Sequence, residues 1–106
     1  MESTFSIIAE PSRRAILSLL ATAEQSVGDI EEHLRMPQPS VSKHLRVLRE
    51  AGLVSARTHA QRRIYELRAE PLAELDAWLE PYRRLWAGRF DDLERHLDER
   101  AKGDTP

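Results

Sequence analysis

The polar side chains with the most evident chemistry lie close together in the stretch PQPSVSKHLRVLR, near the middle of the chain. An amide at Gln38, hydroxyls at Ser40 and Ser42, and cations at Lys43 and Arg46 can all donate hydrogen bonds. An amide can pair with the edge of an adenine, and a lysine or arginine with guanine acceptors or a phosphate. The stretch therefore predicts contact with the major groove of double-stranded DNA.

Outside this stretch the polar residues predict no catalytic chemistry. The chain has no cysteine, which excludes disulfides and thiolate metal sites. No serine stands with a plausible base, and there is no glycine-rich phosphate loop. The acidic doublets at 31–32 and 91–92 are most simply solvated helix faces. We therefore expect a protein that is not an enzyme and that needs no cofactor.

The charge is unevenly distributed along the chain. The formal net charge is −2, but residues 1–34 carry −4, residues 35–68 carry +6 and residues 69–106 carry −4. A basic third between two acidic thirds is the kind of footprint that a phosphate backbone selects. The charge distribution alone would also fit an ordinary solvated surface. The choice between that surface and a DNA-binding one depends on the helices and strands that carry these cations. The cations are Arg35, Lys43, Arg46, Arg49, Arg57, Arg62, Arg63 and Arg68.

One predicted helix positions most of the polar stretch. Pro39 suits its first turn, and Gly52 is placed to end it in the left-handed conformation. Between them, an apolar side and a polar, basic side follow the 3.6-residue period. The apolar side has Val41, Leu45 and Leu48, and the polar side has Ser42, Lys43, Arg46 and Arg49. His44 lies beside the apolar side, so we expect it to be a packed or a capping residue.

A shorter helix is predicted just before this one. Ser26 and Asp29 have the spacing of a capping box, so the helix should start at Ser26 and bury Val27, Ile30 and Leu34. The turn RMP follows. Two short helices separated by about three residues, the second with a basic outer face, are typical of a helix-turn-helix motif. We place it at 26–51.

A β-hairpin is predicted after the glycine. The runs LVSART and RRIYEL, on either side of HAQ, favour strands and form a wing over 53–67. Its arms carry Arg57, Arg62 and Arg63, and we expect Arg62 and Arg63 to contact phosphates or a narrow minor groove. Upstream, a short helix carrying Phe5 and Ile8 and a longer helix that begins at Pro11 are expected.

The segment 71–100 has a helical apolar pattern, and Pro81 must kink or divide it. A chain this small cannot easily bury two tryptophans and so many leucines alone, which favours a dimer interface over a monomer core or a ligand pocket. Two recognition helices must also lie about 34 Å apart on one side of the duplex. The expected interface residues are Phe5, Ile8, Leu75, Trp78, Leu79, Tyr82, Trp86, Phe90, Leu93 and Leu97.

Three stretches, AEPSRRAILSLL, PQPSVSKHLRVLREAGLV and RRIYEL, closely resemble the ArsR (arsenic-repressor-like) family of winged helix-turn-helix regulators. The resemblance covers roughly residues 7–98. It implies a homodimeric repressor that binds an inverted-repeat operator, with Gln38, Ser40, Ser42 and Lys43 reading the groove and Arg46 nearby. The chain departs from the family at the wing tip, where THAQRR lacks the frequent glycine. The predicted DNA-contacting residues are Gln38, Pro39, Ser40, Ser42, Lys43, Arg46, Arg57, Arg62 and Arg63.

Many family members release DNA on binding a metal. The resemblance places one type of site in the segment DIEEHLR, which has no cysteine here, and another in the last helix. There His96 and Glu99 keep the spacing of two ligands, but Arg83 and Leu85 stand where the other two are expected. We therefore expect no metal site and a closer likeness to the metal-free branch.

The fold class that follows is mainly α with a small β-hairpin, a winged helix-turn-helix of order α-α-α-α-β-β-α in one domain, 1–106. The expected partners are operator DNA and a second copy of the chain, with an unknown effector. No apolar run approaches the ~20 residues of a membrane span and no signal peptide is visible, so we expect a cytoplasmic protein. A metal- or ligand-responsive sensor and a protein-interaction module using the aromatic C-terminal helix stay open as alternatives.

Overall fold

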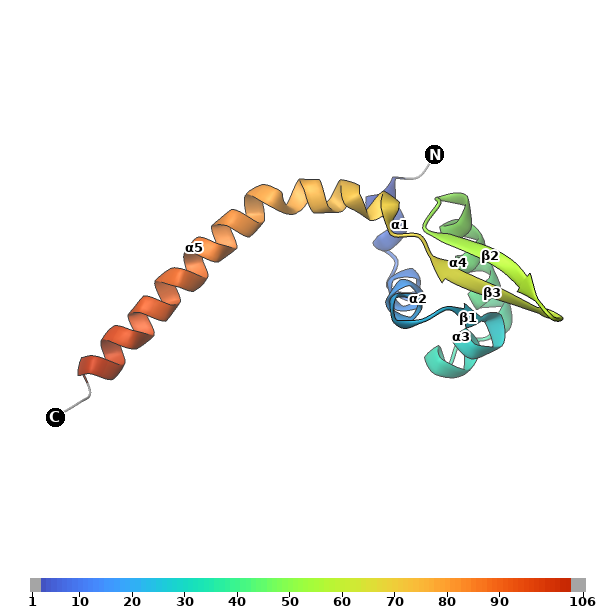
Figure 1. Cartoon of the computed structure of the whole chain (residues 1–106), viewed down its shortest axis with the longest axis horizontal. Helices are drawn as coiled ribbons and strands as arrows, with labels where there is room; N and C mark the ends of the chain where they lie inside the picture. The colour runs from blue at the N-terminus through green and yellow to red at the C-terminus, as the bar shows by residue number, and fades with distance from the viewer. Residues whose placement is uncertain (1–2, 104–106) are drawn as a thin grey trace. The chain divides into compact units, whose positions relative to one another are not determined.

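The computed structural model describes residues 3–103, with side chains for residues 3–100. It has two compact units, one that runs to Leu75 and one that starts at Asp76. The first unit contains four helices, a three-stranded sheet and a short 3₁₀ turn, and the second consists of most of one long helix (Figure 1). The mainly helical winged helix-turn-helix fold that the sequence predicts is confirmed.

Helices α1 (Thr4–Ile8) and α2 (Pro11–Thr22) open the chain. The Glu10 carboxylate caps α2 by accepting a hydrogen bond from the Arg13 N–H at 2.9 Å, and Pro11 occupies the first turn as predicted. Ile7 from α1 and Ile16 from α2 are buried. These two helices provide one wall of the core on which the predicted helix-turn-helix and wing are built.

Helices α3 (Val27–Leu34) and α4 (Gln38–Glu50) form the predicted helix-turn-helix. The capping box of α3 is present, because Ser26 Oγ accepts from the Asp29 N–H and Asp29 Oδ2 accepts from the Ser26 N–H. Arg35 ends α3 with φ at 53°, and Gly52, at φ 77°, follows α4 in the left-handed region. Both ends of the motif are thus fixed by local sequence.

The wing consists of strands β2 (Val54–His59) and β3 (Arg62–Leu67), paired antiparallel in a register that sets His59 opposite Arg62. The prediction of a hairpin is confirmed. The sequence did not predict strand β1 (Gln25–Ser26), which pairs with β3 and gives the sheet the order β1-β3-β2. A two-residue strand is too short to produce an alternating pattern, so it depends on β3 for its existence.

The hydrophobic core unites these elements. Its largest fully buried side chains are Ile16, Ile30, Val41, Leu45, Leu48 and Leu53. Three of these come from α4, so α4 is held in place by its apolar side while its other side stays exposed. Tyr65 of β3, 8 % exposed, belongs to the same core and connects it to the wing.

The 3₁₀ turn η1 (Glu70–Leu72) leads into helix α5 (Ala73–Gly103). The sequence predicts more than one helix in the segment 71–100, but α5 is one continuous helix, so Pro81 does not divide it. Figure 1 shows the ribbon of α5 bending in its first half, which contains Pro81. A bend is the expected result of losing one hydrogen-bond donor and crowding the preceding turn. None of the helices between residues 3 and 103 combines the length and apolar character that a membrane span requires.

Candidate nucleic-acid interface

The outer side of α4 is polar and accessible along its length. Gln38, Pro39, Ser42, Lys43 and Arg46 are exposed, whereas Ser40 is half-buried. Pro37 precedes the helix without a side-chain cap, and its first turn holds no acidic residue. No acidic side chain therefore opposes an anion at the N-terminal turn of α4, although Pro39 has no N–H and the N–H groups of Ser40 and Val41 already donate to the Pro37 carbonyl oxygen. Six of the nine predicted DNA-contacting residues lie on this one helix.

A groove of about 580 Å³ separates α4 from the wing strand β3. Three arginines and a single glutamate surround it, above an apolar floor, so it is positively charged. The lining residues are Ser42, Leu45, Arg46, Arg49, Glu50, Arg63 and Tyr65. An open, cationic groove beside a helix with a polar outer face is suited to a phosphodiester chain.

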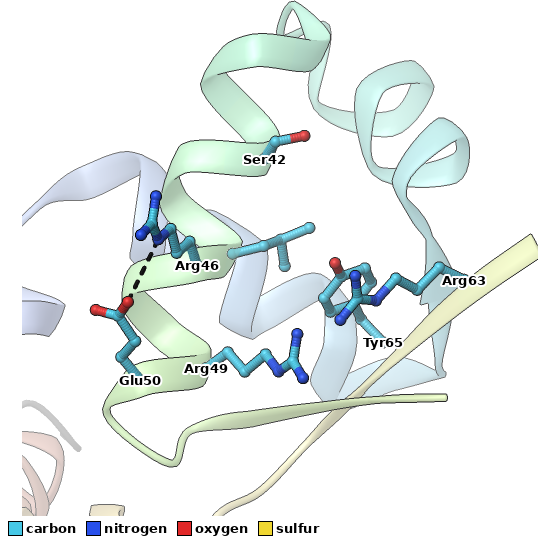
Figure 2. Close-up of a pocket in the computed structure, with 7 residues that line it drawn as sticks. Ser42, Arg46, Arg49, Glu50, Arg63 and Tyr65 are labelled. Atoms are coloured by element: carbon cyan, nitrogen blue, oxygen red, sulfur yellow. Dashed lines mark hydrogen bonds and ion pairs between the residues drawn. The ribbon is translucent and has the colours of Figure 1, made fainter. Parts of the chain in front are cut away.

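Two arginines face each other across this groove. Figure 2 shows Arg49 extending from α4 toward Tyr65, while the guanidinium of Arg63 lies near the Tyr65 ring, 5.7 Å from its centroid. Arg49 has no hydrogen-bond or ion-pair partner among residues 3–100, and Arg63 has only this ring contact there. Both guanidinium groups therefore keep their donors available for a ligand.

Arg46 is held differently from Arg49. Its Nε donates to Glu50 Oε1 at 3.3 Å along the outer side of α4, and both side chains are largely exposed (Figure 2). An exposed pair four residues apart on a helix is worth only about 0.3–0.5 kcal/mol. Such a pair orients Arg46 without preventing it from turning to another anion.

The remaining predicted wing residues, Arg57 and Arg62, are engaged within the protein. Arg57 donates to Glu24 Oε1 at 2.5 Å and to Glu66 Oε1 at 3.2 Å. Arg62 donates to Ser26 Oγ at 2.5 Å and to Asp29 Oδ1 at 3.4 Å. The structure thus brings Arg63 to the groove beside α4, and places Arg57 and Arg62 in contacts with other parts of the chain.

These contacts are accompanied by pKa shifts of the carboxylates. The hydrogen bond from Arg57 lowers the pKa of Glu24 and raises that of Arg57 itself. Hydrogen bonds from Ser26, chiefly from its N–H, lower the pKa of Asp29, with a smaller effect from Arg62. Glu10 also has a lowered pKa, chiefly because it accepts from the Arg13 N–H; its Oε2 lies 3.8 Å from Nδ1 of the half-buried His44.

The sequence does not place Arg49 or Tyr65 at the groove. Arg49 lies on the polar side of the predicted helix but is not among the predicted DNA contacts, and Tyr65 lies within a predicted strand. Arg49 follows Arg46 by three residues and Ser42 by seven, so its place on the same helix face was a usable signal. The position of Tyr65 depended on the pairing register of β3, which the sequence alone does not show.

Helix α5 carries the large apolar side chains that remain exposed in the described chain. Trp86 is 46 % exposed, Phe90 69 %, Leu93 54 % and Leu97 55 %. They recur at intervals of four, three and four residues, which places them along one side of a helix. Trp78, Tyr82 and Leu85 are exposed as well, whereas Leu75 and Leu79, like Phe5 and Ile8 of α1, are partly exposed.

The metal-ligand candidates are not brought together. No group of three or more His, Cys, Asp or Glu side chains within the described residues is placed to hold a metal ion. Arg83, in the position where the family pattern has a ligand, instead donates to the carboxylates of Asp76 and Glu80 on its own helix.

Comparison with known proteins gives a consistent result. The family model described as "Bacterial regulatory protein, arsR family" matches residues 10–56, from the cap of α2 into β2. Transcriptional repressor SdpR of Bacillus subtilis is 35 % identical over 79 residues, which are 74 % of this chain and 88 % of SdpR. HTH-type transcriptional regulator Rv2034 of Mycobacterium tuberculosis is 36 % identical over 97 residues, 92 % of this chain and 86 % of Rv2034.

A solved structure supports the same grouping. The crystal structure of a possible transcriptional regulator for arsenical resistance superposes with a TM-score of 0.69 at 35 % sequence identity. The superposition covers 83 % of this chain and 97 % of that one.

Proposed function

We propose, since the chain belongs to the ArsR family of bacterial regulatory proteins and is a DNA-binding transcriptional regulator, that it represses transcription as a homodimer bound to an inverted-repeat operator. The family is one of regulators and not of enzymes. The observation that carries the proposal is the exposed polar side of α4, continuous with the cationic groove between α4 and β3. The predicted cytoplasmic location belongs to the same proposal, because the operator DNA is there.

Base contacts are assigned to the N-terminal half of α4. Gln38, Ser40, Ser42 and Lys43 carry the donors and acceptors that suit base edges, and Pro39 offers an apolar contact. Their support is their position on a helix whose opposite side is buried at Val41, Leu45 and Leu48. With the inner side fixed, the outer side enters the major groove in a single orientation.

Phosphate contacts are assigned to the groove. Arg49 and Arg63 hold their guanidinium groups where a backbone phosphate can lie, and Arg46 can leave Glu50 to join them. A cation that meets a phosphate releases counterions, so each such contact should make binding more sensitive to salt. Arg57 and Arg62, also predicted as DNA contacts, do not line this groove and donate to other side chains of the protein.

The homodimer is proposed from α5. Trp86, Phe90, Leu93 and Leu97 present an apolar surface that stays in water unless another chain covers it. Contiguous apolar patches of this kind mark interaction sites on otherwise polar proteins. Two copies joined through α5, with help from α1, would supply the two recognition helices that an inverted repeat requires, about 34 Å apart.

The test is fluorescence anisotropy with DNA from upstream of the protein's own gene and a shuffled control, over a range of salt concentrations. The proposal predicts that the operator binds at least ~10³-fold more tightly than the control, with affinity falling steeply as salt rises. Equal affinity for both sequences at every salt concentration would contradict sequence-specific recognition at this site. Sedimentation velocity in the micromolar range tests the dimer separately, and a stable monomer would reject it.

A further inference from the structure

Consecutive arginines of the wing point to opposite sides of the sheet. Arg62 pairs with His59 and Arg63 pairs with Thr58, and successive residues of a strand alternate between the two faces. Arg63 shares its face with Tyr65, on the groove beside α4. Arg62 therefore lies on the other face, together with Arg57 and Glu66. A single phosphate chain in the groove meets only one of these faces.

Arg62 contacts the start of the helix-turn-helix. Its Nη2 donates to Ser26 Oγ at 2.5 Å and approaches Asp29 Oδ1 at 3.4 Å. Ser26 is 4 % exposed and is the N-cap of α3, and Asp29 is the reciprocal member of the same capping box. The first residue of β3 is thus attached to the N-terminus of the helix that precedes the recognition helix.

Arg57 makes a second attachment on this face. It connects β2 both to Glu24, in the segment before β1, and to Glu66 on the adjacent strand. On the same part of the sheet, strand β1 pairs with β3, Gln25 with Tyr65 and Ser26 with Ile64. Together the two arginines attach the middle of β2 and the start of β3 to Glu24, Ser26 and Asp29.

We infer that Arg57 and Arg62 are positioning residues that set the wing against the start of α3, and that the wing meets DNA through the opposite face, at Arg63. The inference rests on the proposed function and revises the prediction that all three arginines contact DNA. For Arg62 to bind a phosphate it would have to leave both Ser26 and Asp29, and the Asp29 carboxylate would then face an anion. Repulsion between the Asp29 carboxylate and the phosphate would oppose the transfer of Arg62 from the protein to DNA.

Substitution of Asp29 distinguishes a positioning role of Arg62 from a phosphate-contacting role, because the two roles predict opposite changes in operator affinity. In Asp29→Asn the side chain can still accept from the Ser26 N–H, so the cap is kept while the charge that holds Arg62 is lost. A positioning role predicts weaker operator binding, because the wing is released. A phosphate-contacting role predicts tighter binding, because Arg62 becomes free and a negative charge has been removed.

The experiment measures operator affinity of the full-length protein against salt for Arg62→Met, Asp29→Asn and Arg63→Met. We expect Arg62→Met and Asp29→Asn each to weaken binding by roughly three- to tenfold with the wild-type salt slope, because no phosphate contact is lost. Arg63→Met should weaken binding and lower the slope by about one. Glu24→Gln is the corresponding variant for Arg57 and should behave like Asp29→Asn.

Amide hydrogen exchange in the absence of DNA gives a second readout. Release of the wing should speed exchange at the Tyr65 amide, opposite Gln25 in the pairing of β3 with β1, in both Arg62→Met and Asp29→Asn. Arg63→Met, on the other face, should leave it unchanged. This measurement keeps the inference testable even if wild-type protein fails to distinguish operator from shuffled DNA, a failure that would reject the proposed function alone.

Four results would overturn the inference. Tighter binding by Asp29→Asn, or a lower salt slope for Arg62→Met, would make Arg62 a phosphate contact. Unchanged operator affinity in both variants would remove any positioning role in DNA binding. Unchanged amide exchange would show that the wing is held by its strand pairing alone.

Discussion

Helices α4 and α5 use their apolar residues in opposite ways. On α4, Val41, Leu45 and Leu48 are at most 1 % exposed, because the rest of the winged unit covers them. On α5, Phe90 is 69 % exposed and Leu93 54 %. The apolar side chains of α4 are buried within its own chain, and its polar side remains available for a ligand. Helix α5 leaves its apolar side chains exposed, which is why we propose DNA binding through α4 and assembly through α5.

The largest effect should come from removing an apolar side chain of α4. Leu45→Ala leaves a cavity in a packed core and should lower the free energy of unfolding by about 2–5 kcal/mol. Urea denaturation should give this loss at every protein concentration, because the contact lies within one chain. Leu93→Ala is the matched variant on α5. It should lower the free energy of unfolding only at protein concentrations at which the protein is dimeric. A concentration-dependent loss for Leu45→Ala would contradict the assignment.

Introducing a charge on α5 should have the next largest effect. Phe90→Asp removes a large apolar side chain from both copies of the proposed interface, at about 1.5 kcal/mol or more for each. The dimer should therefore weaken by about 3 kcal/mol, roughly 100-fold in its dissociation constant. Sedimentation velocity should show monomer where the wild type is dimeric. Glu94→Gln, a polar exchange on the same helix, is the control, and an intact dimer for Phe90→Asp would contradict the account.

Removing one cation from the groove should have a moderate effect on DNA binding alone. Arg49→Ala should cost about 1 kcal/mol of operator affinity, roughly fivefold, and lower the salt slope by about one. The free energy of unfolding should stay within about 0.5 kcal/mol of wild type, because Arg49 is exposed. Arg84→Ala removes an equal charge from α5 and should leave the operator affinity unchanged. Equal losses for both variants would indicate a non-specific charge effect.

The smallest effect is expected at the wing tip. Ala60, the first of two residues between β2 and β3, has φ at 56°, a region that residues with a Cβ rarely adopt. Ala60→Gly relieves this strain, but glycine also raises the conformational entropy of the unfolded chain, which offsets part of the stabilisation. The free energy of unfolding should therefore rise by about 0.5 kcal/mol. Thermal denaturation followed by circular dichroism measures it. A lower melting temperature would mean that the loop tolerates alanine without strain.

The helix-turn-helix could be predicted from sequence because local signals define it. The Ser26–Asp29 capping box, the glycine at position 52 and the apolar spacing of Val41, Leu45 and Leu48 each act within a few residues. All three are found in the structure where the sequence places them. Strand β1 was not predictable in this way, since it exists only through pairing with a strand almost forty residues away.

The candidate site was less accessible to sequence reasoning for the same reason. Composition identifies Arg57, Arg62 and Arg63 as equivalent cations of one hairpin. Strand register separates them, because it turns Arg63 to the groove and Arg62 to Ser26 and Asp29. Arg49 gains its place in the groove only when α4 and β3 are packed around Tyr65. Which cation faces a ligand is thus decided by long-range packing.

The most direct test of the division of roles is amide chemical-shift mapping of the labelled protein on addition of operator DNA. We expect the shifted amides to lie in α4 and around Arg63 of β3, and the amides of α5 beyond Asp76 to keep their chemical shifts. Shifts concentrated on α5, with α4 unchanged, would contradict it, because the exposed apolar helix would then be the surface that meets DNA.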